Sequence, residues 1–293
     1  MNAPSLAATG LGANTVLVLL GCGIFGALAG AVGTFVIARR RSLIADVAGH
    51  AALPGVCLAF LAGEALHIGG RTPWLLLIGA ACTALLAAWF VPWLSRRFAI
   101  GADGATAVSL ALFFGLGAVL LSLVQSHESG SQGGLRRLLF GSAAATSSAD
   151  VKTLAALALV TLVALALLFK ELSLLAFDEQ HARTLGFPVR SLDLLLTLLL
   201  VATVVAGMQL AGIVLVVSMV ITPAATARFF HGSIARVTAI AAGFGAASAV
   251  CGVLVSLEFE HLPTGPAMTL CAAGLFLLAL LATTRGRAEA VQS

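Results

Sequence analysis

The chain has 293 residues, of which 60% are hydrophobic and 10% charged, and its mean hydropathy is +1.09. Because a soluble domain carries about 25% charged residues, there are too few polar side chains here to cover a water-soluble globule. The formal net charge of +4 comes from short basic clusters between apolar runs, which indicate membrane topology rather than nucleic-acid binding. Composition therefore predicts an all-α membrane protein and excludes a soluble enzyme or a nucleic-acid binder.

Apolar runs long enough to cross a membrane recur along the whole chain. About 20 mostly apolar residues span a hydrocarbon layer about 30 Å thick. We expect about nine spans, with eight as the alternative, in a single integral membrane domain over 1–293. The tract 192–227 forms either a tight helical hairpin, which we favour, or one long bent helix. The predicted spans are 15–38, 43–63, 73–94, 104–126, 151–169, 192–206, 210–227, 236–257 and 267–283.

The basic residues predict which span ends face the cytoplasm. With the N-terminal segment 1–14 outside, nine spans place twelve of the 16 Lys and Arg residues on the cytoplasmic side and four outside. Because the cytoplasmic loops of membrane proteins carry an excess of Lys and Arg, this bias favours nine spans over eight. It also places the connection 170–191 and the tail 284–293 in the cytoplasm.

An ionisable pair lies inside the second predicted span. Asp46 and His50 are four residues apart, so on a helix they share one face about one turn apart. An ionisable residue in the hydrocarbon layer costs at least about 2.5–3 kcal/mol and must face the bundle interior or a cavity. We expect Pro54 and Gly55, just beyond the pair, to loosen the helix and open space for a ligand.

A carboxylate oxygen with an imidazole nitrogen suits a divalent cation such as Zn²⁺ or Mn²⁺. Alternatively, Asp46 and His50 simply neutralise each other. Two ligands are too few for tight tetrahedral binding, whereas a two-fold dimer would bring two such pairs together and supply four.

The connection 170–191 is charged and compatible with a helix until Gly186 and Pro188. A polar helix held between two spans on the cytoplasmic face is a candidate docking element for a partner protein. An ordinary solvated loop explains the same pattern, and the residues alone leave both interpretations open.

Other polar residues give weaker signals. Asp193 lies near the end of a predicted span, where a cap or an interface residue is expected. The chain contains no GxxxxGK(S/T), GxSxG or HExxH motif, which excludes ATP binding by a phosphate loop and the usual hydrolase and zinc-protease sites. Five residues in the predicted outer loops could receive a cation from outside, although a solvated rim explains them more simply: His127, Glu128, Glu258, Glu260 and His261.

Five stretches of the sequence, in chain order, are informative together: RRRSLIADVAGHAALPGVCLAF (39–60), LLFGS (138–142), AFDEQHARTLGFPVRSLDLLL (176–196), ITPAATARFF (221–230) and HLPTGPAMTL (261–270). They resemble the membrane permeases of ABC importers for zinc, manganese and iron, and the similarity covers nearly the whole chain. The resemblance implies a homodimer in the bacterial inner (plasma) membrane, two cytoplasmic ATP-binding subunits and an external metal-binding protein.

The resemblance also assigns roles to individual residues. The metal-coordinating Asp and His of the family fall on Asp46 and His50. Its ATPase-contacting helix falls on about 176–187, within the coupling region 170–191. The residues expected to couple to the ATPase are therefore Asp178, Glu179, His181, Arg183 and Gly186.

We accordingly expect a transport subunit that is not an enzyme, with ATP hydrolysis on a separate partner and with no permanently bound cofactor. Zinc is the first choice for the transported metal because His with carboxylate is a common zinc ligand set, with manganese second and iron third. The alternative is a proton-coupled secondary metal transporter, in which Asp46 and His50 would form a proton relay. An intramembrane hydrolase would need a third ligand and a base, and the sequence offers neither in a matching span.

Overall fold

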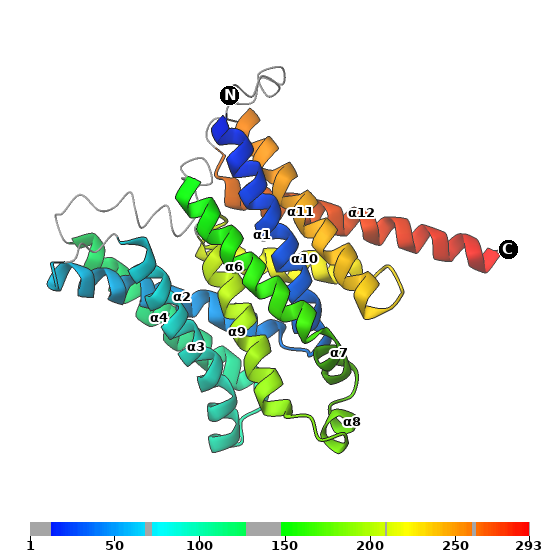
Figure 1. The fold of residues 1–293 in the computed structure, drawn as a ribbon, viewed down its shortest axis with the longest axis horizontal. Helices are drawn as coiled ribbons and strands as arrows, with labels where there is room; N and C mark the ends of the chain where they lie inside the picture. Colours follow the sequence, from blue (N-terminus) through cyan, green and yellow to red (C-terminus); the bar gives the residue numbers. More distant parts are fainter. Residues whose placement is uncertain (1–12, 68–71, 127–147, 209, 260–261, 293) are drawn as a thin grey trace.

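The computed structural model describes residues 13–67, 72–126, 148–208, 210–259 and 262–292 (Figure 1). These residues form α-helices and contain no strand, so the all-α prediction is confirmed for them. The helices are α1 (Ala13–Ala38), α2 (Ser42–Ala65), α3 (Pro73–Phe98), α4 (Ala102–Ser126), α6 (Ser148–Leu167), α7 (Phe169–Phe177), α8 (Glu179–Thr184), α9 (Val189–Gly207), α10 (Ile213–Ala227), α11 (Ile234–Glu258) and α12 (Thr264–Gln292).

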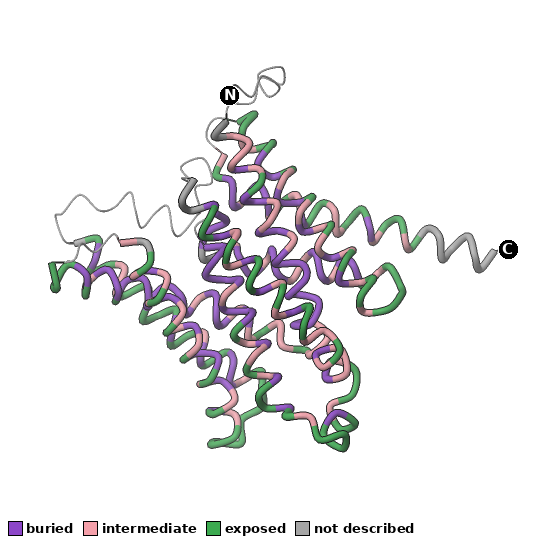
Figure 2. The backbone as a smooth tube through the Cα atoms, viewed as in Figure 1, coloured by how far each residue is buried: buried purple, intermediate pink, exposed green. Residues whose placement is uncertain are grey.

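The helices pack in two sets that meet along α9 and α10 (Figure 1). Helices α2, α3 and α4 form one set, and α1, α6, α11 and α12 lie on the other side, with α1 packed most closely on α11. Figure 2 shows buried residues concentrated where the helices meet, while α4 and α12 are largely exposed. Such apolar exposed faces are expected where a helix meets lipid.

Small residues bring neighbouring helices into close contact. A Cβ atom at Gly55 of α2 would overlap the backbone of Gly79 on α3, and one at Gly26 of α1 would overlap Gly245 on α11. Small residues permit this close backbone approach in membrane bundles. Helix α2 also runs without a break through the buried Pro54. Gly55 therefore closes the contact with α3, and Pro54 lies against Gly117 of α4. The helix is not interrupted at these two residues, contrary to the expected loosening.

The number of spans differs from the prediction. Within the described residues, seven helices are long and apolar enough to cross a membrane, and eight spans result if α6 and α7, bent by 66°, are counted as one. The bundle is confirmed, but the preferred count of nine is too high by this measure. The helix that falls short is α10, whose 15 residues rise about 22 Å against a hydrocarbon layer of about 30 Å.

Helix α10 is short because the chain turns inside the bundle before α10 begins. Met208, Leu210 and Ala211 are buried, and the Ala211 and Gly212 N–H groups donate to Gly207 O and Met208 O. Irregular backbone at membrane depth is tolerated when protein surrounds it and its polar groups are paired. The tract 192–227 thus forms two helices, as favoured, but α10 packs mainly on α1, α11 and α12, so the pair is no tight hairpin.

Candidate functional site

The predicted metal pair lies on one face of α2. His50 Nε2 is 3.5 Å from Asp46 Oδ1, and the side chains are 23% and 40% exposed respectively in the single chain. The His50 ring packs edge-on against Phe114 of α4, with 5.3 Å between ring centroids. Val47 and Ala48, which point elsewhere around the same helix, are fully buried. Core packing of their neighbours therefore fixes the direction in which Asp46 and His50 project.

One chain cannot complete a metal site with these two side chains. No group of three or more His, Cys, Asp and Glu residues that could hold a metal occurs among the described residues. The pair offers one carboxylate and one imidazole, whereas a tetrahedral zinc site needs four ligands. An ionisable pair this exposed on a membrane helix must face a cavity or another subunit.

The predicted coupling region forms two short helices rather than one helix over 176–187. Asp178 lies between α7 and α8, and its Oδ1 accepts the His181 backbone N–H at 2.9 Å, an N-cap that begins α8. Gly186 has φ +83°, and the Phe187 N–H donates to Ala182 O at 3.1 Å. Glycine adopts this conformation without steric cost and ends the helix, as the sequence predicted.

The predicted coupling residues do not all face the same way. The His181 and Arg183 side chains are exposed, whereas Glu179 is partly buried and accepts hydrogen bonds from Arg183 and from Arg39. Those bonds, from Arg39 first and Arg183 second, lower the pKa of the Glu179 carboxyl. Helix α8 therefore shows an exposed polar face and turns one carboxylate towards the end of α1.

Sequence reasoning missed the partners of Glu179. Arg39 also donates to Asp193 of α9, with Nη2 at 3.1 Å from Oδ1, and Arg41 Nη2 lies 2.8 Å from Asp193 Oδ2. We name Arg39, Arg41, Glu179 and Asp193 the charge junction. The sequence treated the two arginines as topology signals and Asp193 as a cap or interface residue. The signal that could have revealed the junction is Asp193 itself, because a lone acid beside a long apolar run needs a cation as its partner.

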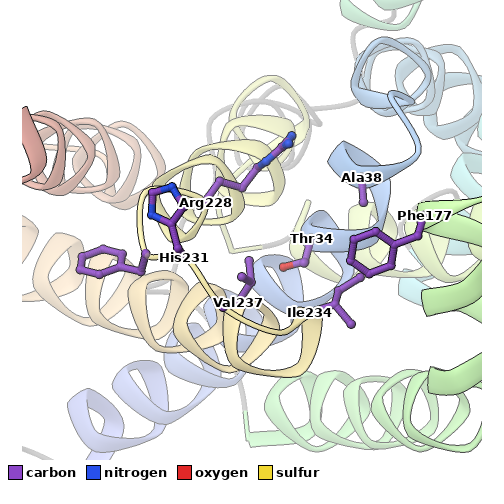
Figure 3. A pocket seen from close by; sticks show the side chains of 9 residues that line it. Thr34, Ala38, Phe177, Arg228, His231, Ile234 and Val237 are labelled. Carbon is purple, nitrogen blue, oxygen red and sulfur yellow. The ribbon is translucent and has the colours of Figure 1, made fainter.

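A cavity of about 260 Å³ lies beside Phe177 at the end of α7 (Figure 3). It is lined by Thr34 of α1, Phe177 at the end of α7, and Arg228 and His231 between α10 and α11. Its described lining contains these two basic side chains and no acidic one. The cavity also shows that the end of α10 lies beside the ends of α1 and α7, as the predicted topology requires.

The candidate outer-side residues are mostly untested. His127, Glu128, Glu260 and His261 lie outside the described residues, as does nearly all of the predicted N-terminal segment, over residues 1–12. Glu258 is exposed and ends α11. Helix α11 begins at Ile234, beside the cavity, so Glu258 lies at the far end of the molecule from α8. That position agrees with the predicted outer side.

A bundle of seven or eight spans, with an ionisable pair on a membrane helix and a short polar helix at one end, defines a polytopic membrane permease. Residues 13–283 match the family model described as the ABC 3 transport family. The chain belongs to this family. It is a multi-pass plasma-membrane protein, and the resemblance inferred from the five stretches is confirmed.

Curated relatives match most of the chain. It is 40% identical over 276 residues, 94% of its length, to the manganese transport system membrane protein MntC of Bacillus subtilis, of which it spans 62%. It is 34% identical over 264 residues to the zinc transport system membrane protein TroC of Treponema pallidum, covering 90% of this chain and 87% of that one. The structure of PsaBC from Streptococcus pneumoniae in complex with Fab matches with a TM-score of 0.81 and 31% identity over 95% of both chains.

Proposed function

We propose that the chain is the permease subunit of an ATP-driven importer for a divalent metal, and that Asp46 and His50 hold the metal during passage. The observation that carries this proposal is the pair itself. Its side chains lie 3.5 Å apart and remain partly exposed on a membrane-spanning helix. Because an exposed ionisable pair is costly against lipid, a water-filled path between subunits is the environment that suits it.

In this proposal the permease is a homodimer with the ion on its two-fold axis. Two copies of the pair supply two carboxylates and two imidazoles, a donor set that suits Zn²⁺ and Mn²⁺. A site shared between two moving subunits opens when they separate, so the ion is released after each cycle. Relatives are named for manganese and for zinc; zinc stays our first prediction, with manganese the alternative and iron third.

The ATP-binding subunits dock, in this proposal, on the face that carries α8. Phe177 and Leu185 are 77% and 57% exposed there, next to the exposed His181 and Arg183 and to the cavity described above. Exposed apolar side chains outside the lipid-facing spans are expected to be covered by a protein partner. An external binding protein delivers the metal at the opposite end, near Glu258.

The test is metal uptake into liposomes by the complete complex of permease, ATPase and binding protein. Asp46→Asn and His50→Gln should each abolish ATP-dependent uptake of ⁶⁵Zn or ⁵⁴Mn while the ATPase still co-purifies. Asp103→Asn, in the exposed first turn of α4, neutralises an acidic side chain away from the pair; it is the control and should transport normally.

Normal uptake in either site variant would contradict the proposed site. Uptake driven by a pH gradient through the permease alone would contradict the ATP-driven class and support the secondary carrier. The isotope accumulated at equal free concentrations decides which metal is the substrate.

A further inference from the structure

Arg39 of the charge junction joins the connection after α1 to three consecutive helices, α7, α8 and α9, which it contacts at residues 136 to 154 positions further along the chain. Arg39, just after α1, donates through Nη1 to the backbone oxygen of Leu175 on α7 at 3.0 Å. Its Nη2 donates to Glu179 of α8 at 2.9 Å and to Asp193 of α9 at 3.1 Å. A single guanidinium therefore binds α7, α8 and α9 to the end of α1.

The Arg39–Asp193 pair at the centre of the junction is too well buried to behave as a surface ion pair. The side chains of Arg39 and Asp193 are only 11% and 17% exposed. Surface pairs contribute little because water and salt screen them, but removal of one partner from a buried pair leaves an uncompensated charge and is strongly destabilising. The planar fork of Arg also fixes the direction of each bond. These segments are therefore expected to move as one body.

The second arginine extends this body to the metal-bearing helix. Arg41 pairs with Asp193 at 2.8 Å, and its backbone oxygen accepts the N–H groups of Ile44 and Ala45 in the first turn of α2. Asp46 is the fifth residue after Arg41, which corresponds to about 7.5 Å of helix rise. Because α2 is continuous over Ser42–Ala65, a shift of its first turn also shifts the pair.

We propose that Asp193, together with Arg39 and Arg41, positions α2 by locking its first turn to α8, so that movement of α8 by the ATP-binding subunit is transmitted to Asp46 and His50. The inference rests on the proposed function and deepens it, since it names the residues that link the ATPase face to the metal pair. These are positioning residues, and they do not touch the ion.

The neighbouring Arg40 provides a matched control. It lies between the two junction arginines, its side chain is exposed, and it makes no ion pair among the described residues. Arg40→Gln therefore removes the same charge from the same connection without touching the junction.

The first experiment measures metal transported per ATP hydrolysed by the complete complex. In Asp193→Asn and Arg41→Gln we expect ATP hydrolysis to continue while metal moved per ATP falls at least about fivefold, the lower end of typical coupling between sites. Arg40→Gln should match wild type. If transport and hydrolysis fall together in proportion, or if neither changes, the proposal is overturned.

The second experiment leaves all four junction residues in place and so does not depend on a junction variant folding. Genetically encoded spin labels at the exposed Gln180 of α8 and Leu43 of α2 report the distance within one subunit. We expect that distance to stay constant between the nucleotide-free and ATP-trapped complexes, while the distance between the two Leu43 labels of the dimer changes. A change within the subunit as large as the change between subunits would refute a rigid link.

The two proposals fail in distinguishable ways. If Asp46→Asn transports normally, the metal site is wrong, whereas the Gln180–Leu43 distance still decides whether the link is rigid. If Asp46→Asn abolishes uptake and Asp193→Asn keeps wild-type metal per ATP, the site stands and the positioning role alone is rejected.

Discussion

The molecule places ionisable side chains in two contrasting ways. On α2, Asp46 and His50 have each other at 3.5 Å and remain partly exposed. At the charge junction, Arg39 reaches three segments at once and is nearly buried. A pair with spare donor capacity can exchange a ligand, whereas a guanidinium whose two Nη groups bond three other segments holds those segments together. The contrast separates the proposed metal site from a structural link that lies within about two helical turns of it.

The largest expected effect tests the first half of this comparison. Asp46→Ala and His50→Ala should each reduce ATP-driven metal uptake at least about 100-fold, an effect of about 2.7 kcal/mol. Asp46→Ala should leave the thermal unfolding temperature of the purified permease nearly unchanged, and His50→Ala should lower it only by the loss of the Phe114 contact, because both side chains are only partly buried. A variant that unfolds more easily and transports at the normal rate would reverse the assignment.

The next effect concerns the ATPase face. Reversing the charges of Asp178, Glu179 and Arg183 together should prevent co-purification of the ATP-binding subunit, since these residues form or border the exposed side of α8. Asp178→Ala alone removes only the cap of α8, which costs about 1 kcal/mol, and should reduce complex yield slightly. Full recovery of the complex with the triple variant would show that docking occurs elsewhere.

For Arg39 of the charge junction we expect the opposite of what we expect for the metal pair: its removal should reduce the stability of the permease. Arg39→Ala should destabilise the permease by about 3 kcal/mol, the lower end for a broken buried pair, because Arg41 and Arg183 still partner the two carboxylates. Thermal unfolding in detergent measures this, with Arg40→Ala as the control. Equal unfolding temperatures for the two variants would mean that the junction contributes no stability.

The comparison also requires α2 to be held firmly along its length. Gly55→Val should destabilise the bundle, because the new side chain would overlap Gly79 and Thr83 of α3. The control is Gly115→Val on α4, where an added Cβ meets no atom within 4 Å. Equal stability of both variants would show that the α2–α3 contact can relax.

The smallest expected effect is a pH dependence. Bonds from Arg39 and Arg183 lower the pKa of Glu179, so its contribution to stability is fully present above the ordinary Glu pKa of about 4.3 and is lost as pH falls through the lowered value. The unfolding temperatures of wild type and Glu179→Gln should therefore differ by a constant amount from pH 8 to 5 and converge under more acidic conditions. Because Glu179 is 37% exposed, solvent screening keeps the difference small. A difference that grows on acidification would contradict the assigned cause.

The sequence predicted the elements whose signals are local. Long apolar runs predicted the spans, and Gly186 marked the end of α8. The turn at Met208–Gly212 was harder to predict from the sequence, because only the packing of α1, α11 and α12 around α10 makes a buried break stable. The charge junction was missed for a related reason: Arg39 and Asp193 are 154 residues apart, and nothing in the local pattern pairs them.

The central claim is that two copies of Asp46 and His50 hold one transported ion. It is tested most directly by the number of ions bound per permease chain at saturation, measured by equilibrium dialysis of the purified dimer with ⁶⁵Zn or ⁵⁴Mn. We predict one ion per two chains for wild type and none for His50→Gln. One ion per chain, or unchanged binding in His50→Gln, would contradict it.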